Sequence, residues 1–196
     1  MKILERGSII LSVVGLLMKI LIVRGGNELL MIGMTLLMLV YWTFGFAVFN
    51  NIQLKAIFKK SSYAGISSGR IVGAIGVGGF LSIIVTGLLL KLLILAGARE
   101  MITIGVTGLF ITLFAAGVVF ILKKKNMDSF YKQIFVKGGL AVILGITLFL
   151  TPTSSLIRFY HRDDPLYAEL FIKAVENPYD KEIQKKFEEA REKKYK

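Results

Sequence analysis

Long apolar stretches alternate with short polar connections along the first 157 residues of this chain. A helix that crosses a bilayer needs about 20 mainly apolar residues. None of the stretches alternates as a strand would, and a single lipid-exposed segment must satisfy its own backbone, which favours helices. The pattern therefore predicts an all-α polytopic membrane protein whose transmembrane domain covers residues 1–157. Its five predicted transmembrane helices lie at about 7–24, 29–50, 70–98, 101–122 and 134–157.

The apolar pattern also repeats. Residues 13–37 align with residues 85–109 without a gap at an offset of 72, and 13 of the 25 pairs are identical. Apolar composition alone does not explain the matched pairs Gly15 and Gly87, Lys19 and Lys91, Gly25 and Gly97, and Glu28 and Glu100. We interpret the chain as two parallel two-helix repeats, at about 7–50 and 70–122, followed by a fifth helix at about 134–157.

Strongly basic and weakly basic connections alternate along the chain, which predicts the orientation of the helices in the membrane. The weakly basic turns carry only Arg24 and Arg99. The strongly basic regions are the N-terminus and the second and fourth connections, with Lys2, Arg6, Lys55, Lys59, Lys60, Arg70, Lys123, Lys124, Lys125, Lys132 and Lys137. Positive residues favour the cytoplasmic side. We therefore expect a multi-pass protein of the bacterial inner membrane, with a cytoplasmic N-terminus and the C-terminal tail outside.

The tail, residues 158–196, differs sharply from the rest because it holds nine of the 13 acidic residues. Asp164 is predicted to cap a helix that begins at Pro165, and Asn177 to cap a second one that begins at Pro178. Leu166, Leu170, Phe171 and Ala174 share one face of the first helix, and Tyr179, Ile183 and Phe187 recur every four residues in the second. We expect an extramembrane helical tail whose two amphipathic helices pack together or on a partner.

Composition excludes several classes of function. Hydrophobic residues make up 55% of the chain, and its net charge of +12 lies at the ends of apolar stretches, so we expect no nucleic-acid binding. The chain has no cysteine and one histidine, His161, which does not make a metal site by spacing. No catalytic constellation appears. We therefore predict that the protein is not an enzyme and uses no cofactor or metal.

Lys19 and Lys91 are the sharpest candidate site residues, because each lies within an apolar stretch. A lysine inside a membrane is costly, but its long side chain can reach the interface. Two interpretations stay open: snorkelling to the interface, or an intramembrane cation that lines a cavity. Glu28 and Glu100 follow nine residues later in each repeat, where they favour a helix N-terminus and are possible ion-pair partners.

Glycines mark candidate helix-packing surfaces. Small residues allow membrane helices to approach closely. One set lies before and within the third stretch, as a repeated small-residue spacing, and another lies in the fifth stretch: Gly65, Gly69, Gly73 and Gly76, then Gly138 and Gly145. The first set predicts a helix seam within the chain or with a partner. Alternatively, Gly65 and Gly69 belong to a flexible loop.

The first hairpin resembles the transmembrane hairpin of the L subunit of the gliding-motility and type IX secretion motor. The residues that carry the resemblance are Gly15, Lys19, Ile20, Leu21, Gly26, Asn27, Glu28, Leu29, Leu30, Ile32 and Gly33. The resemblance implies a related hairpin in an inner membrane, with Lys19 and Lys91 at the position of the family's intramembrane lysine. The family's histidine, Trp-Pro pair and second-helix glutamate have no counterpart, so proton conduction is not implied.

These observations favour a non-enzymatic scaffold or accessory subunit of an envelope assembly, related to secretion or motility. Its expected partners are the lipid bilayer and other membrane protein chains or further copies of itself. One alternative is a small transporter or channel for an anionic solute that uses Lys19 and Lys91. A further alternative is an ion-driven, stator-like motor subunit, which would require an acid from another chain.

Overall fold

The computed structural model describes residues 1–122 and 128–195, which form α-helices and two short 3-10 turns, with no strand among them. The chain divides into two compact units, Met1–Leu150 and Thr151–Lys196. The sequence placed this boundary at residue 157. It lies earlier because Pro152 ends the fifth long helix. Lys123, Lys124, Lys125 and Lys196 lie outside the described residues.

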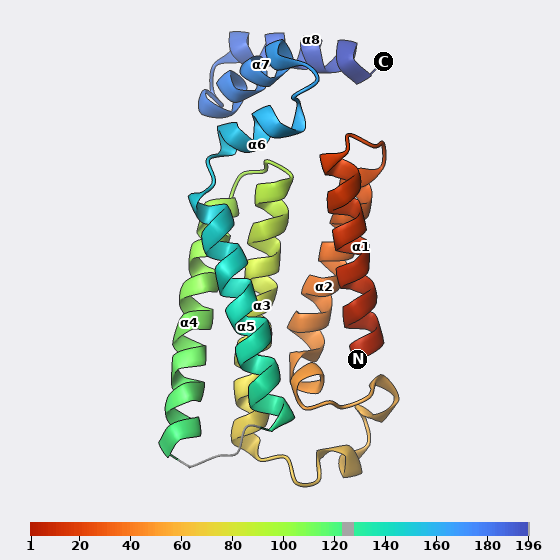
Figure 1. Ribbon diagram of the computed structural model, residues 1–196, viewed down its shortest axis with the longest axis vertical. Helices are drawn as coiled ribbons and strands as arrows, with labels where there is room; N and C mark the ends of the chain where they lie inside the picture. Colours follow the sequence, from red (N-terminus) through yellow and green to blue (C-terminus); the bar gives the residue numbers. More distant parts are fainter. Residues whose placement is uncertain (123–127, 196) are drawn as a thin grey trace. The chain divides into compact units, whose positions relative to one another are not determined.

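The described residues of the first unit form five long helices, whose arrangement is seen in Figure 1. They are α1 (Lys2–Ile20), α2 (Gly26–Phe49), α3 (Ser68–Leu92), α4 (Ala98–Leu122) and α5 (Ser129–Leu150). Among the described residues, α2, α3, α4 and α5 are long and apolar enough to cross a membrane. The first predicted span, residues 7–24, is not among them, because the corresponding helix α1 carries Lys2, Glu5, Arg6 and Lys19 within its 19 residues.

The turns that join α1 to α2 and α3 to α4 have the same backbone geometry. Ile22 and Ile94 take φ of 58° and 59°, and Gly25 and Gly97 take φ of 85° and 82°. In each turn, the second and third amides after the helix donate back to carbonyls of its last turn, as in a Schellman motif. β-branched residues rarely adopt this left-handed conformation, so its occurrence at both isoleucines is a shared, strained feature.

Glycines set the distance between the helices of each hairpin. A Cβ added to Gly15 of α1 would lie 2.3 Å from the amide nitrogen of Leu30 in α2. The matching position in the second hairpin, Gly87 of α3, would meet the amide nitrogen of Ile102 in α4 at 2.7 Å. Any larger residue at either position would therefore force the two helix backbones apart.

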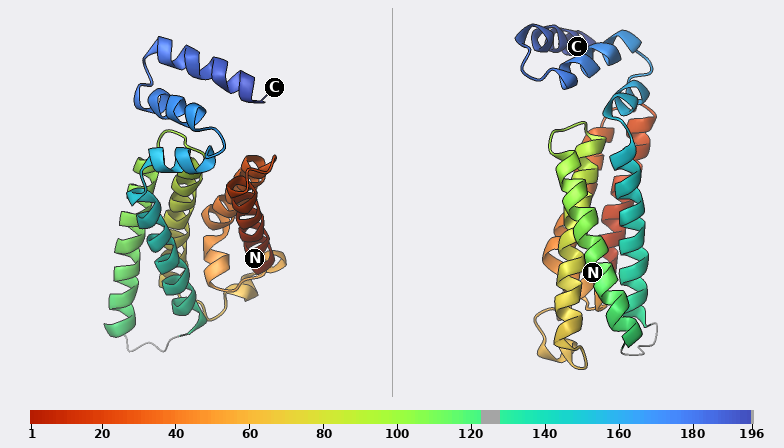
Figure 2. Two further views of the ribbon diagram at one scale, coloured as in Figure 1. Left: turned by 45° about the horizontal axis from the view of Figure 1, so that its top comes forward. Right: turned by 90° about the vertical axis from the view of Figure 1, so that its left-hand side faces the viewer.

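Helix α3 lies at the centre of the unit, where it packs on α2, α4 and α5. The three helices α3, α4 and α5 lie together in all views (Figure 2). Gly45 of α2 and Gly78 of α3 bring these two helices close, with 2.8 Å between an added Cβ and the facing Cα. Nearby, Phe44 has non-helical φ and ψ, which kinks α2. Leu81 and Ile84 of α3 are among the most buried side chains.

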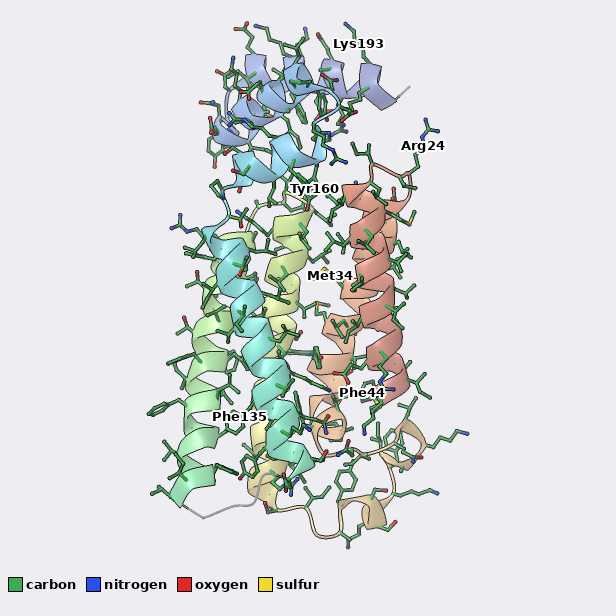
Figure 3. The ribbon with its side chains drawn as sticks, viewed as in Figure 1. Arg24, Met34, Phe44, Phe135, Tyr160 and Lys193 are labelled. Atoms are coloured by element: carbon green, nitrogen blue, oxygen red, sulfur yellow. The ribbon has the colours of Figure 1, made fainter. Side chains whose placement is uncertain are left out.

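Side chains fill the spaces between these helices (Figure 3). Met34 of α2 is buried in the main core, and Phe135 of α5 meets Phe120 of α4 edge to face at 6.4 Å. Arg24 is exposed and projects from the α1–α2 turn. By contrast, α4 and α5 leave most of their apolar side chains uncovered by the rest of the chain, as expected for helices that face lipid or a partner.

The connection from α2 to α3 is folded. It contains two 3-10 turns, Leu54–Ala56 and Lys60–Tyr63. Ile52 and Ile57 are buried with Ala47 in a small cluster, and the hydroxyl of Tyr63 donates to the Ile57 carbonyl at 2.6 Å. This connection lies at the same end of the unit as the N-terminus (Figure 1).

The second unit contains α6 (Thr153–Tyr160), α7 (Pro165–Glu176) and α8 (Lys181–Tyr195). Asp164 caps α7 as predicted, since its side chain accepts the Tyr167 amide at 3.0 Å. The second predicted cap is wrong: α8 begins after Asp180, whose carboxylate accepts the amides of Glu182 and Ile183.

The predicted packing of the tail is partly confirmed. Helices α7 and α8 pack together around Tyr167, Ala174 and Phe187. Leu166 and Tyr179 are wrong members of the predicted faces because their side chains are 86% and 96% exposed. Tyr179 precedes α8 rather than belonging to it, so the periodicity of that helix cannot bury it. Helix α6 was not predicted as a separate helix.

Candidate functional site

Glu5 is the acid that stands out in the first unit, because only 4% of it is exposed. It lies in the first turn of α1. Both of its carboxylate oxygens accept hydrogen bonds from Nζ of Lys137 in α5, at 2.5 and 2.7 Å. Its Oε1 also accepts the hydroxyl of Tyr41 in α2 at 2.7 Å. One carboxylate thus joins three helices.

Aromatic packing positions the two donors. The ring of Tyr41 stacks on Phe49 with the two rings 13° apart and their centroids at 6.4 Å. The Nζ of Lys137 lies 5.5 Å from the centroid of the same Phe49 ring. Phe49 is fully buried. It therefore holds both the phenol and the ammonium group in place, and adds a weak cation–π attraction.

The charges in this site balance. A buried, isolated carboxylate would be very costly, but here it is paired with one ammonium group and accepts a further hydrogen bond. A carboxylate paired so closely to an internal lysine can hold helices together. The site contains no second acid. Among the described residues, no group of three histidine, cysteine or acidic side chains could hold a metal ion.

Sequence reasoning missed this site. Glu5 lies before the first predicted span, residues 7–24, and was given no role, and Lys137 was counted among the basic residues of the fourth connection. The structure begins α1 at Lys2 and α5 at Ser129, so both residues lie inside helices. The available signal was that Lys137 lies within the fifth predicted span, residues 134–157, although it was counted with the flanking basic residues.

A second polar cluster joins the start of α3 to the start of α5. Arg70 of α3 pairs with Asp128 at 2.9 Å, and its guanidinium lies 4.4 Å from the centroid of the Phe130 ring. Asp128 also accepts the amides of Phe130 and Tyr131, so it caps α5. The predicted loop cation Arg70 therefore anchors the first turn of α5.

Lys19 and Lys91 lie in the last turns of α1 and α3, one residue before each helix ends. Both are partly buried. The backbone carbonyl of each accepts the amide of the left-handed isoleucine that follows. A cation there interacts favourably with the helix C-terminus. The sequence placed these lysines deeper because it extended the helices to residues 24 and 98.

Glu28 and Glu100 are exposed at the third positions of α2 and α4. An acid at a helix N-terminus is also favourable. Each hairpin thus places a cation at the end of one helix and an anion at the start of the next. These favourable positions at the helix ends fit the repeated spacing, and pairing of these acids with the lysines stays a prediction.

The predicted packing glycines fall into two groups. Gly138 and Gly145 of α5 face α4, where an added Cβ would meet Leu113 at 2.8 Å and Val106 at 2.6 Å. An added Cβ on Gly76 would be 3.8 Å from Thr112. Gly65, Gly69 and Gly73 face open space among the described residues, and Gly65 lies in a loop with φ of 79°. These three glycines therefore form no helix seam among the described residues, and their packing against a partner stays a prediction.

Comparisons of the chain with protein-family models, curated proteins and solved structures found no match. The resemblance of the hairpins to the motor subunit gains no support from them. The interpretation of this chain therefore rests on its own residues: a helical unit with four candidate membrane spans, one buried acid shared by three helices, and a helical C-terminal unit.

Proposed function

We propose that the chain is a non-enzymatic scaffold or accessory subunit of an assembly in the bacterial inner membrane. The observation that carries this proposal is the Glu5 site, in which the buried acid is already neutralised by Lys137 and bonded to Tyr41. Such a site holds helices in place, and its acid is both neutralised and almost fully buried. The uncovered apolar sides of α4 and α5 supply surface for lipid or partner helices.

The proposal includes five membrane crossings built from two duplicated hairpins. Helix α1 packs along the candidate span α2 through Gly15 and through Gly33, where an added Cβ would lie 2.5 Å from the amide nitrogen of Ser12. Its 19 residues span roughly 28 Å, close to the hydrocarbon thickness. The matching turns and glycine contacts at an offset of 72 support a common origin of the two hairpins.

Site-specific photocrosslinking in intact cells tests the scaffold function. Photoreactive side chains would replace Leu17 of α1, Phe114 of α4 and Ile143 of α5, which are 52%, 68% and 63% exposed. A scaffold gives a discrete protein adduct from at least one of these faces, and the same adduct from neighbouring positions on that face. Reaction with lipid alone at all three positions would contradict the proposal.

A transporter or channel for an anionic solute is the second candidate, favoured by the partly buried positions of Lys19 and Lys91 beside matching turns. The test uses liposomes that contain the purified chain. If chloride or phosphate enters faster than in empty liposomes, and Lys19→Met with Lys91→Met abolishes the difference, transport replaces the scaffold. If the rates are equal, the scaffold stands.

The ion-driven alternative now has an acid within the chain, since Glu5 is buried. The same liposomes with an internal pH dye test it against Glu5→Gln. The scaffold proposal expects proton entry to match empty liposomes for both proteins. Proton entry that Glu5→Gln removes would favour the ion-driven function.

A further inference from the structure

The connection between α2 and α3 exposes an unusual combination of apolar and basic side chains. Phe58 is 97% exposed and Leu54 is 47% exposed. Lys55, Lys59 and Lys60 alternate with them and are also exposed. We call the surface formed by these five residues the basic–aromatic loop.

The fold holds these side chains outward. Ile57, the residue before Phe58, is buried with Ile52 beneath the loop, and the hydroxyl of Tyr63 bonds to the Ile57 carbonyl. The Tyr63 ring in turn stacks on Phe46 of α2, with centroids 6.4 Å apart. Because Ile57 is fixed inward, its neighbour Phe58 is directed away from the protein. Its exposure is therefore built into the loop.

The loop itself carries charge of one sign, and the two acids brought to this end of the unit, Glu5 and Asp128, are each paired with a basic side chain. The chain has no acidic residue between Glu28 and Glu100. The side chain of Met1 packs against the cluster beneath the loop, which brings the exposed Lys2 and Arg6 of α1 to the same end of the unit. A cluster of lysines beside a membrane span attracts anionic lipid headgroups.

The loop also lies at the right level for lipid. It follows Phe49, the last residue of candidate span α2, and precedes Ser68, the first residue of candidate span α3. It must therefore lie at one membrane surface. An apolar side chain that is fully exposed at this level can enter the boundary between headgroups and acyl chains, while adjacent lysines remain among the phosphates.

We propose that the basic–aromatic loop is a binding surface for anionic phospholipids of the adjoining leaflet. Phe58 and Leu54 insert below the headgroups, and Lys55, Lys59 and Lys60 contact the lipid phosphates. The loop thereby fixes the depth of the α2–α3 end of the unit and enriches anionic lipid around it. This inference requires membrane insertion but does not depend on scaffold function.

The test places a fluorescent reporter in the loop of the full chain. Trp42, the single tryptophan, is replaced by Phe, and Phe58 is replaced by Trp. This change leaves the packed cluster intact because Phe58 is almost fully exposed. The protein is reconstituted in vesicles of POPC, or of equal POPC and POPG, with or without brominated acyl chains. We expect blue-shifted emission from the tryptophan at position 58 and strong quenching by brominated lipid. In the mixed vesicles, quenching should be stronger when POPG carries the bromine than when POPC carries it.

Charge variants separate lipid selection from simple insertion. Lys55→Gln, Lys59→Gln and Lys60→Gln together should lower the preference for POPG over POPC at least roughly tenfold. The matched control, Lys181→Gln, Lys185→Gln and Lys193→Gln, removes the same charge from exposed positions of α8 and should leave the preference unchanged.

Three outcomes would overturn the proposal. Red-shifted emission without bromolipid quenching would show that Phe58 faces water or a protein partner. Equal quenching by the two lipids would show insertion without selection of anionic lipid. Equal loss of selection in the loop and α8 variants would assign the effect to net charge alone.

Discussion

At the scale of single residues, the two hairpin turns contain the most specific backbone feature of the chain. Ile22 and Ile94 occupy a left-handed conformation that favours glycine or asparagine. The sequence showed that glycine recurs in the turns but placed the helix ends at residues 24 and 98. The reason is physical: isoleucine has a propensity for helix or strand, and no neighbouring residue indicates a positive φ.

Replacing Ile22 with Asn should stabilise the protein by up to about 1 kcal/mol, because asparagine tolerates this conformation with less strain. The measurement is the free energy of unfolding in mild-detergent micelles titrated with SDS. Val23→Asn is the matched control, since Val23 is exposed to a similar extent and is not among the residues with positive φ. Equal effects of the two substitutions would show that strain at Ile22 is not the cause.

At the scale of elements, glycine contacts determine how close the helices of each hairpin lie. The apolar stretches predicted the long helices because they are continuous, and the repeat predicted which glycines correspond. Which glycine faces which backbone could not be predicted, because that depends on the rotation of each helix about its axis. The most regularly spaced glycines, Gly65, Gly69 and Gly73, face open space, whereas Gly15, Gly45 and Gly78 make the close approaches.

Gly15→Ala and Gly87→Ala should each destabilise the protein by about 1–3 kcal/mol, because the added methyl group meets the backbone of the facing helix. SDS titration of the purified chain measures the effect. Gly73→Ala, with nothing within 4 Å of the added Cβ, should be neutral or stabilising through helix propensity. A loss of stability at Gly73 as large as that at Gly15 would contradict this account of the hairpins.

At the scale of the whole molecule, the number of crossings decides whether the N-terminus and the C-terminal tail lie on the same side of the membrane. Apolar content predicted the membrane setting, and the described structure contains four helices that meet the length and composition of a span. Helix α1 is not one of these four because it has charged residues near both ends, so its crossing of the membrane is tested separately. The Glu5 site was beyond sequence analysis because its three residues are 36 and 96 positions apart along the chain.

Cysteine labelling can determine the crossings, since the native chain has no cysteine. Single variants Ile3→Cys, Ser61→Cys and Tyr179→Cys, all exposed, are treated with a membrane-impermeant maleimide in cells whose inner membrane is intact. Five crossings place Ile3 and Ser61 together on the protected side and Tyr179 on the labelled side. If Ile3 is labelled together with Tyr179, α1 does not cross.

The central claim is that Glu5, Tyr41 and Lys137 form a self-contained bond between the first hairpin and α5. The most direct test is the free energy of unfolding of Glu5→Leu, Lys137→Leu and the double variant, measured by SDS titration. Each single variant leaves one partner of the buried pair without its counter-charge and should cost about 3 kcal/mol. The double variant should be more stable than either single variant, because no unpaired charge remains. If the double variant loses as much stability as the two single variants combined, the two residues act independently and the account is wrong.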